Sequence, residues 1–322
     1  MATTHGRARR GFTLIEVLVA MTVGVLLLML TMQIVQTILR SSSSTDQRVE
    51  VDRAARLIGV ALQRDLQEAG VDVSSSPKFG SVWVKGDTIV MLRVPYKHST
   101  AGDTAAYVYP IIMPEDRPGA GTGTACGTFC LDIDLANGNP VGGASLPIQP
   151  AVGGAALLIA NGQSRLILPT AITNAGATAQ VTFANVTAFL GHPTGLRNPN
   201  IQLAPSGNTL QQVIATTYYR SGTSLMRATT YTSTGAPQGE VLADSVTAWS
   251  VKVLFVDGDS ATTANPTDAD LTNDWNDVSG VRITATIAPN APDRRTGQTP
   301  PPRTYQWTVS PRNLTYERNR LN

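Results

Sequence analysis

The stretch His5-Gly-Arg-Ala-Arg-Arg-Gly-Phe-Thr-Leu-Ile-Glu16 runs directly into an apolar segment that extends to about Val35. The next charged residue after Glu16 is Arg40. A secretory signal peptide places its apolar core before the cleavage site. Here the plausible processing point, between Gly11 and Phe12, precedes that core. Cleavage there removes a basic leader and leaves the apolar segment on the mature chain.

This arrangement resembles the leader of type IV pilins and of the pseudopilins of type II secretion. The residues that carry the resemblance are Gly11, Phe12, Thr13, Leu14, Ile15 and Glu16, followed by Val17-Leu-Val-Ala20. The resemblance implies that a prepilin peptidase removes residues 1–11 as a leader and methylates the new amino terminus at Phe12. The alternative interpretation is an ordinary signal anchor in which Glu16 occurs by chance.

Residues 12–39 are rich in Leu, Val, Met and Ile and contain no proline. About twenty such residues span the hydrocarbon of a bilayer, and the spanning backbone must be helical to satisfy its polar groups. The arginines of the leader predict that the N-terminal side faces the cytoplasm. We therefore expect a single pass through a membrane with the rest of the chain exported. The resemblance implies that this is the inner membrane and that the subunit later takes a place in a pilus at the cell surface.

Residues 40–70 are expected to continue the helix as an amphipathic segment. One face carries apolar residues at three- and four-residue steps: Val51, Ala54, Ala55, Ile58, Leu62, Leu66 and Ala69. The opposite side is assigned the charged residues Glu50, Asp52, Arg53, Arg64, Asp65 and Glu68. Gly70 suits the position just after the helix end. The serine run Ser41–Ser44 leaves a kink, a melted turn and an N-cap as open alternatives.

Glu16 is an acid beside or inside hydrocarbon, where charged side chains are costly and usually functional. In the family that the chain resembles, this acid is thought to attract the N-terminal ammonium of a neighbouring subunit. Two unit charges ~4 Å apart gain about 4 kcal/mol at an effective dielectric near 20. We predict that Glu16 sets the axial position at which subunits dock. The alternative is a glutamate that reaches the lipid headgroups.

Residues 71–322 are expected to form one elaborated, β-rich exported domain, and hence an α+β fold with an antiparallel sheet on the helix. A hairpin is predicted around Arg220-Ser-Gly-Thr. Pro118–Gly154 is interpreted as an irregular insertion, and Pro289–Pro302 as a connection rich in helix and strand breakers. The predicted strands are Ser81–Val84, Thr88–Val94, Ala105–Ile112, Ala155–Ile159, Arg165–Leu168, Thr178–Val186, Gln212–Tyr219, Ser224–Thr230, Val246–Val256, Val278–Ile287 and Thr304–Val309.

Net charge and cysteine spacing argue against two classes of function, nucleic-acid binding and zinc binding. The 25 basic and 23 acidic residues give a net charge of +2, and three arginines belong to the leader, so bulk charge does not favour a nucleic-acid-binding protein. Cys126 and Cys130 have no neighbouring Cys or His to complete a zinc site. In an oxidising exported compartment we expect them to form a local disulfide, worth roughly 2 kcal/mol.

Catalytic and metal-binding patterns are sparse. Asp257 and Asp259 are weak calcium candidates because alanine stands where the next oxygen ligand is needed, so a solvated turn is favoured. His98 and His192 lie in polar contexts without a nucleophile motif. We predict that the protein is not an enzyme and that it binds no cofactor. An exported, membrane-anchored enzyme is the alternative from a different functional class.

The C-terminal half adds a second, looser resemblance. Tyr218-Tyr-Arg220 with Leu225-Met-Arg227, then Val241–Val246, Val251–Asp259 and Trp275 before Val281-Arg-Ile283, look like PilW-type minor pilins and, more distantly, J-type pseudopilins. This resemblance implies a minor pilin that helps to initiate or cap a filament with other minor and major pilins. The alternative is a minor pseudopilin of a type II secretion system. Any surface ligand is unknown.

Overall fold

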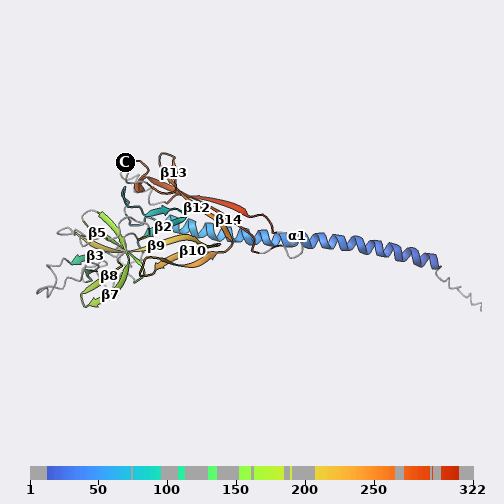
Figure 1. Cartoon of the computed structure of the whole chain (residues 1–322), viewed down its shortest axis with the longest axis horizontal. Coiled ribbons are helices and arrows are strands. Elements are labelled where there is room, and N and C mark those ends of the chain that lie inside the picture. Colours follow the sequence, from blue (N-terminus) through green and yellow to red (C-terminus); the bar gives the residue numbers. More distant parts are fainter. Residues whose placement is uncertain are drawn as a thin grey trace, which may run out of the picture. The chain divides into compact units, whose positions relative to one another are not determined.

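The computed structural model describes one long helix and a β-rich C-terminal region, drawn in Figure 1. The described residues are 13–73, 75–95, 108–112, 130–135, 152–160, 163–184, 189–190, 207–264, 272–290, 292 and 299–311. The helix together with antiparallel sheets gives the α+β class that the sequence predicts.

Helix α1 runs from Leu14 to Glu68 as a single element of 55 residues. Its backbone is helical through Ser41–Ser44. Two of the alternatives for this serine run, a melted turn and the N-cap of a second helix, are therefore wrong. Gly70 adopts a φ of 80°, which confirms its predicted place just after the helix. The amide of Gly70 then donates to the carbonyl of Leu92, 2.9 Å away, which connects the end of α1 to strand β2, Thr88–Arg93.

The chain divides into two compact units. One comprises residues 1–52 and 289–301, and the other comprises residues 53–288 and 302–322. In the first unit, Asn290 Nδ2 donates to Glu50 Oε1 over 2.7 Å, which joins the segment that begins at residue 289 to the helix. The predicted division at residues 11, 39 and 70 stays a prediction.

The second unit contains a large antiparallel sheet built around the 13-residue strand β9, Thr209–Ser221. Its second half pairs with β2 and β10, and its first half pairs with β3 and β5. The other members are β1 Val82–Lys85, β2 Thr88–Arg93, β3 Val108–Ile112, β4 Cys130–Asp134, β5 Ala155–Ala160, β6 Gln163–Ile167, β7 Pro169–Ala175, β8 Thr178–Phe183, β10 Ser224–Tyr231 and β11 Pro237–Ala243.

The predicted hairpin is confirmed as β9–β10, which Figure 1 shows side by side. Ser221 pairs with Ser224, so Gly222 and Thr223 form the turn between them. Gly222 has a φ of 61°, the left-handed conformation that the first central position of a type II′ turn requires. A residue with a Cβ adopts this conformation only at a cost, which explains glycine at this position.

A second, four-stranded antiparallel sheet has the order β13-β12-β14-β15. Its strands are β12 Val246–Phe255, β13 Ser260–Ala261, β14 Val278–Ile287 and β15 Arg303–Val309, and a short 3-10 turn, η2 Trp275–Asp277, precedes β14. Alternate residues of β12 and β14 are buried, so one face of this sheet belongs to the core. The indole Nε1 of Trp249 on β12 donates to the carbonyl of Asp87, which links this sheet to the β1–β2 turn.

Both sheets contact the part of α1 that belongs to the second unit. The side chains of Ile58, Leu62 and Leu66 on this part of the helix are fully buried, which confirms the predicted apolar face. Trp307 of β15 lies against Gly59, and the large sheet approaches the helix at Asp65. The sequence predicted one sheet on the helix, whereas two sheets enclose its buried face.

Four strands were missed: β4, β7, β11 and β13. β7, β11 and β13 are short, polar or rich in turn-forming residues, so they carry little alternating apolar signal. β4 does alternate, but it has only five residues and lies within a stretch rich in glycine and proline. The interpretation of Pro118–Gly154 as wholly irregular is wrong at β4. There Leu131 and Ile133 are buried, and the strand pairs with β3 on one side and with β8 on the other.

Candidate assembly site

Glu16 lies in the first turn of α1. Thr13 precedes the helix, and its carbonyl accepts hydrogen bonds from the amides of Glu16 at 3.0 Å and Val17 at 3.3 Å. An acid in the first turn interacts favourably with the positive end of the helix dipole. The Glu16 side chain is exposed and forms no ion pair within the described part of the chain. It is therefore available to a charge from outside this subunit.

A shallow hollow along the helix surface includes Glu16. Its lining is Thr13, Ile15, Glu16, Val19, Ala20, Val23, Gly24 and Leu27. Ala20 and Gly24 follow Glu16 at four-residue steps and so lie on the same face. A Cβ placed on Gly24 would meet no atom within 4 Å. Small residues beside the acid therefore leave room for close approach by another helix.

The apolar part of α1 is long enough to cross a membrane. The span Leu14–Leu39 has 26 residues, and its large apolar side chains are exposed. At 1.5 Å per residue it measures about 39 Å, more than the roughly 30 Å of a hydrocarbon core. The hydroxyls of Thr22, Thr31 and Thr37 each donate to a carbonyl in the preceding turn of the helix, 2.9 Å away. These polar groups are thus satisfied within the helix itself, as lipid surroundings require.

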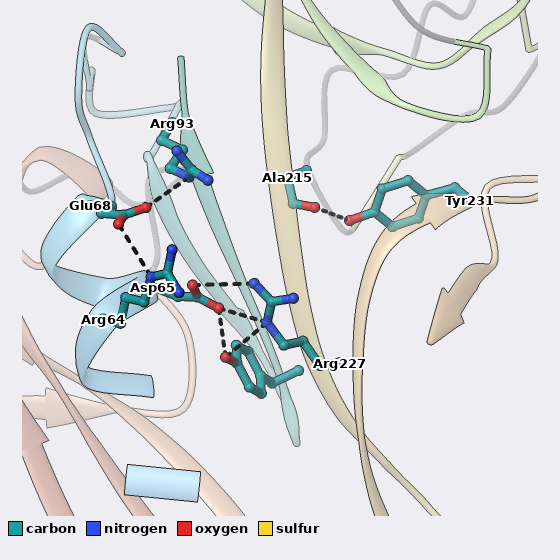
Figure 2. A network of polar contacts seen from close by, with 8 residues as sticks. Arg64, Asp65, Glu68, Arg93, Ala215, Arg227 and Tyr231 are labelled. Carbon is teal, nitrogen blue, oxygen red and sulfur yellow. Dashed lines mark hydrogen bonds and ion pairs between the residues drawn. The ribbon is translucent and has the colours of Figure 1, made fainter. Parts of the chain in front are cut away.

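Further along the helix, Asp65 joins α1 to the large sheet (Figure 2). Arg227 of β10 donates through Nε to Asp65 Oδ2 at 2.9 Å and through Nη2 to Oδ1 at 3.3 Å. The hydroxyl of Tyr218 on β9 donates to Asp65 Oδ2 at 2.6 Å. Beside this group, Glu68 forms an ion pair with Arg93 of β2, with Nε and Oε2 3.2 Å apart. Buried charge is tolerated here because both carboxylate oxygens of Asp65 are hydrogen-bonded.

The protonation of this network follows from burial and charge. Burial is the main cause that raises the pKa of Tyr218, and the hydrogen bond to Asp65 adds to the shift. The hydrogen bond to Asp65 is the main cause that raises the pKa of Arg227. Burial also raises the pKa of Tyr231, whose hydroxyl donates to the carbonyl of Ala215. The tyrosines therefore stay neutral and Arg227 stays charged over the physiological range.

The assignment of Asp65 to the polar side of the helix is wrong. Only 6% of Asp65 is exposed. Its position seven residues after Ile58 and three after Leu62 places it on the buried face. An acid at a buried helical position signals a cationic or hydroxyl partner elsewhere in the chain. That spacing was the available signal, although the partners themselves lie more than 150 residues away.

The remaining predicted residues are only partly described. Gly11, Phe12 and Cys126, together with His98 and His192, lie outside the described residues. Cys130 begins β4, and its disulfide with Cys126 stays a prediction. Asp257 and Asp259 are exposed in the turn after β12, where Asp257 Oδ1 accepts from the amide of Asp259. No group of three or more metal-ligating side chains occurs among the described residues.

Comparison with known proteins identifies the N-terminal signal. Residues 6–32 match the family model described as the prokaryotic N-terminal methylation motif. No curated protein and no solved structure matches the chain. The matched range includes Arg7, Arg9 and Arg10, then Glu16 and most of the apolar segment of the helix.

The motif and the exposed apolar helix agree with each other. The matched residues overlap the segment of α1 from Leu14 to Leu39, which is long and apolar enough to cross a membrane. The chain therefore carries a type IV pilin-like prepilin signal on a helix suited to single-pass anchoring, which supports a pilin-like or pseudopilin-like substrate of a prepilin peptidase.

Proposed function

We propose that this chain is a minor pilin of a type IV pilus, cleaved between Gly11 and Phe12 and N-methylated on Phe12. The observation that carries the proposal is the methylation motif at residues 6–32 in direct continuity with a 55-residue helix whose first part exposes its apolar side chains. Such a helix is stable in lipid before assembly and among other apolar helices afterwards, since both surroundings bury its side chains away from water.

The subunit helps to initiate or cap the filament together with other minor and major pilins. Support for a minor role comes from the resemblance of the stretches between Tyr218 and Ile283 to PilW-type chains. The large C-terminal region also favours a tip position, because lateral packing is less demanding there than in the shaft. The exported region then reaches the cell surface, while unassembled subunits remain in the inner membrane.

A minor pseudopilin of a type II secretion system is the second candidate, since the same motif and helix serve both machines. The genes that neighbour the gene for this chain distinguish a minor pilin from a minor pseudopilin. Genes for a retraction ATPase and other pilins favour the pilus, and genes for secretion-system components favour the pseudopilin.

Mass spectrometry of the protein purified from its own cells tests the shared part of the proposal. The mature chain should begin at Phe12 and carry one additional methyl group on its amino terminus. Gly11→Ala is the matched variant, because it changes only the residue before the cut and should accumulate with its leader intact. A wild-type chain that retains Met1, or that begins well downstream of Phe12, contradicts the proposal.

A further inference from the structure

The outer face of α1 in the second unit carries exposed arginines and exposed aliphatic side chains. We call this surface the arginine face; it consists of Arg53, Arg56, Leu57, Val60 and Arg64. These residues recur at three- and four-residue steps, so they share one side of the helix, opposite the buried face. Leu57 is 53% exposed and Val60 is 67% exposed. Leu57 and Val60 are three positions apart and lie among the arginines, so this face offers a small apolar contact beside positive charge.

The charges of the arginine face are largely unmatched within the described part of the chain. Arg53 and Arg56 form no ion pair there. Arg64 has only a long contact with Glu68, with Nε and Oε1 3.6 Å apart, and Glu68 also binds Arg93. A shallow hollow lined by Val60, Gln63, Arg64, Gln67 and Glu68 lies beside the arginines. The surface thus offers cations, apolar contacts and a depression on one helix.

The acids within residues 50–68 of this helix are already engaged inside the chain. Asp65 binds Arg227 and Tyr218, Glu68 binds Arg93, and Glu50 accepts a hydrogen bond from Asn290. A second copy that presents the same face would therefore place arginines against arginines. Like charges in contact oppose docking strongly, which is how interfaces exclude wrong partners.

We propose that the arginine face docks the helix of a different pilin-like subunit, one that presents Asp or Glu at three- and four-residue spacing around aliphatic side chains. The acids pair with Arg53, Arg56 and Arg64, while Leu57 and Val60 supply the apolar contact. This inference rests on the proposed function and specifies the chemistry of its partner. It makes the chain a hetero-assembling subunit whose neighbour is selected by charge.

The test uses the full chain in cells that also produce their other prepilin-type proteins. A photoreactive benzoylphenylalanine replaces Val60, and cross-linked products are identified by mass spectrometry. The expected product joins position 60 to a different protein, at an apolar helical residue flanked by acids. Benzoylphenylalanine at Thr308, an exposed position on β15, is the matched control and should not give this product.

Charge variants decide whether the arginines select the partner. Arg53→Glu with Arg56→Glu should lower the yield of the Val60 product by roughly tenfold, equivalent to about 1.4 kcal/mol. Arg53→Lys with Arg56→Lys keeps both charges and should retain most of the product. Equal thermal melts of the two double variants exclude misfolding as the cause.

A product between two copies of this chain, the absence of any product at position 60, or a yield independent of charge each overturns the inference. These failures differ from a failure of the proposed function. If the chain begins at Phe12 but the Val60 product is absent or insensitive to charge, only the docking inference is wrong. If the leader is never removed, the proposed function itself is wrong.

Discussion

Arg227 holds the carboxylate of Asp65 in a two-point contact across 162 positions of sequence, through Nε at 2.9 Å and Nη2 at 3.3 Å. Asp65 is on α1, and Arg227 is on β10. The pair therefore joins the helix that carries the apolar span to the large sheet.

Breaking this pair from one side should destabilise the second unit. Asp65→Asn keeps the size of the side chain but leaves the partly buried guanidinium without its counter-charge. Because Arg227 remains 29% exposed, we expect a loss of about 2–4 kcal/mol, at or below the cost of breaking a fully buried pair. Thermal unfolding of the full chain in detergent micelles measures it.

Removing both partners should cost less than the sum of the two single changes. Asp65→Asn combined with Arg227→Met removes the unpaired charge as well as the bond, so a double-mutant cycle should give a coupling energy of about 1–3 kcal/mol. A coupling energy near zero means that the contact contributes nothing to stability. Arg282→Met, at an exposed position on β14, is the control and should have little effect.

Stability should fall in alkaline solution. The pKa values of Tyr218 and Tyr231 are raised above the ordinary value of 10.0, mainly by burial. Above about pH 10 the unfolded chain releases these protons while the folded chain retains them, so the free energy of unfolding decreases as the pH rises. Below about pH 10 the protonated tyrosines make their full contribution to the free energy of unfolding. Tyr218→Phe should flatten the decrease, as followed by chemical unfolding at a series of pH values.

Gly59 should not tolerate a larger residue. A Cβ at Gly59 would lie 2.6 Å from Nε1 and 3.2 Å from Cδ1 of Trp307. Gly59→Ala must displace the indole, and we expect a loss of about 1–3 kcal/mol. The control is Gly24→Ala, where no atom lies within 4 Å and a helix normally gains about 1 kcal/mol. If Gly59→Ala raises the melting temperature, the close packing of Trp307 on the helix is refuted.

Glu16 should matter for assembly rather than for folding or cleavage. The exposed carboxylate has no ion-pair partner among the described residues, so Glu16→Val should leave the melting temperature of the full chain unchanged. The variant should lose its leader yet be recovered in sheared pili far less than wild type, as immunoblots of the pilus and membrane fractions measure. Glu16→Asp keeps the charge and is the matched control. Wild-type recovery of Glu16→Val in pili contradicts the docking role.

Joining Cys126 to Cys130 should add a small amount of stability. The loop between them is short, so the double variant Cys126→Ser with Cys130→Ser should cost roughly 2 kcal/mol. Thiol labelling of the unfolded, unreduced protein should detect no free thiol. Labelling of both cysteines excludes the disulfide.

Local sequence determined the elements whose signal is carried by their own residues. The apolar span and the face of Ile58 and Leu62 follow from composition and helical spacing alone, and β14 has the bounds that were predicted. The β9–β10 hairpin could also be predicted from the sequence, because Gly222 between two strand patterns marks a turn that needs a positive φ.

Tertiary structure decided what depends on partners distant in sequence. β4 alternates apolar and acidic residues, but its five residues lie in a stretch rich in glycine and proline, and pairing with β3 and β8 is what satisfies its backbone. The role of Asp65 depends on Arg227 and Tyr218, which the sheet brings to the helix. The spacing of residues along the helix predicts which of its faces is buried. Only the folded structure determines which side chains and which sheets contact that face.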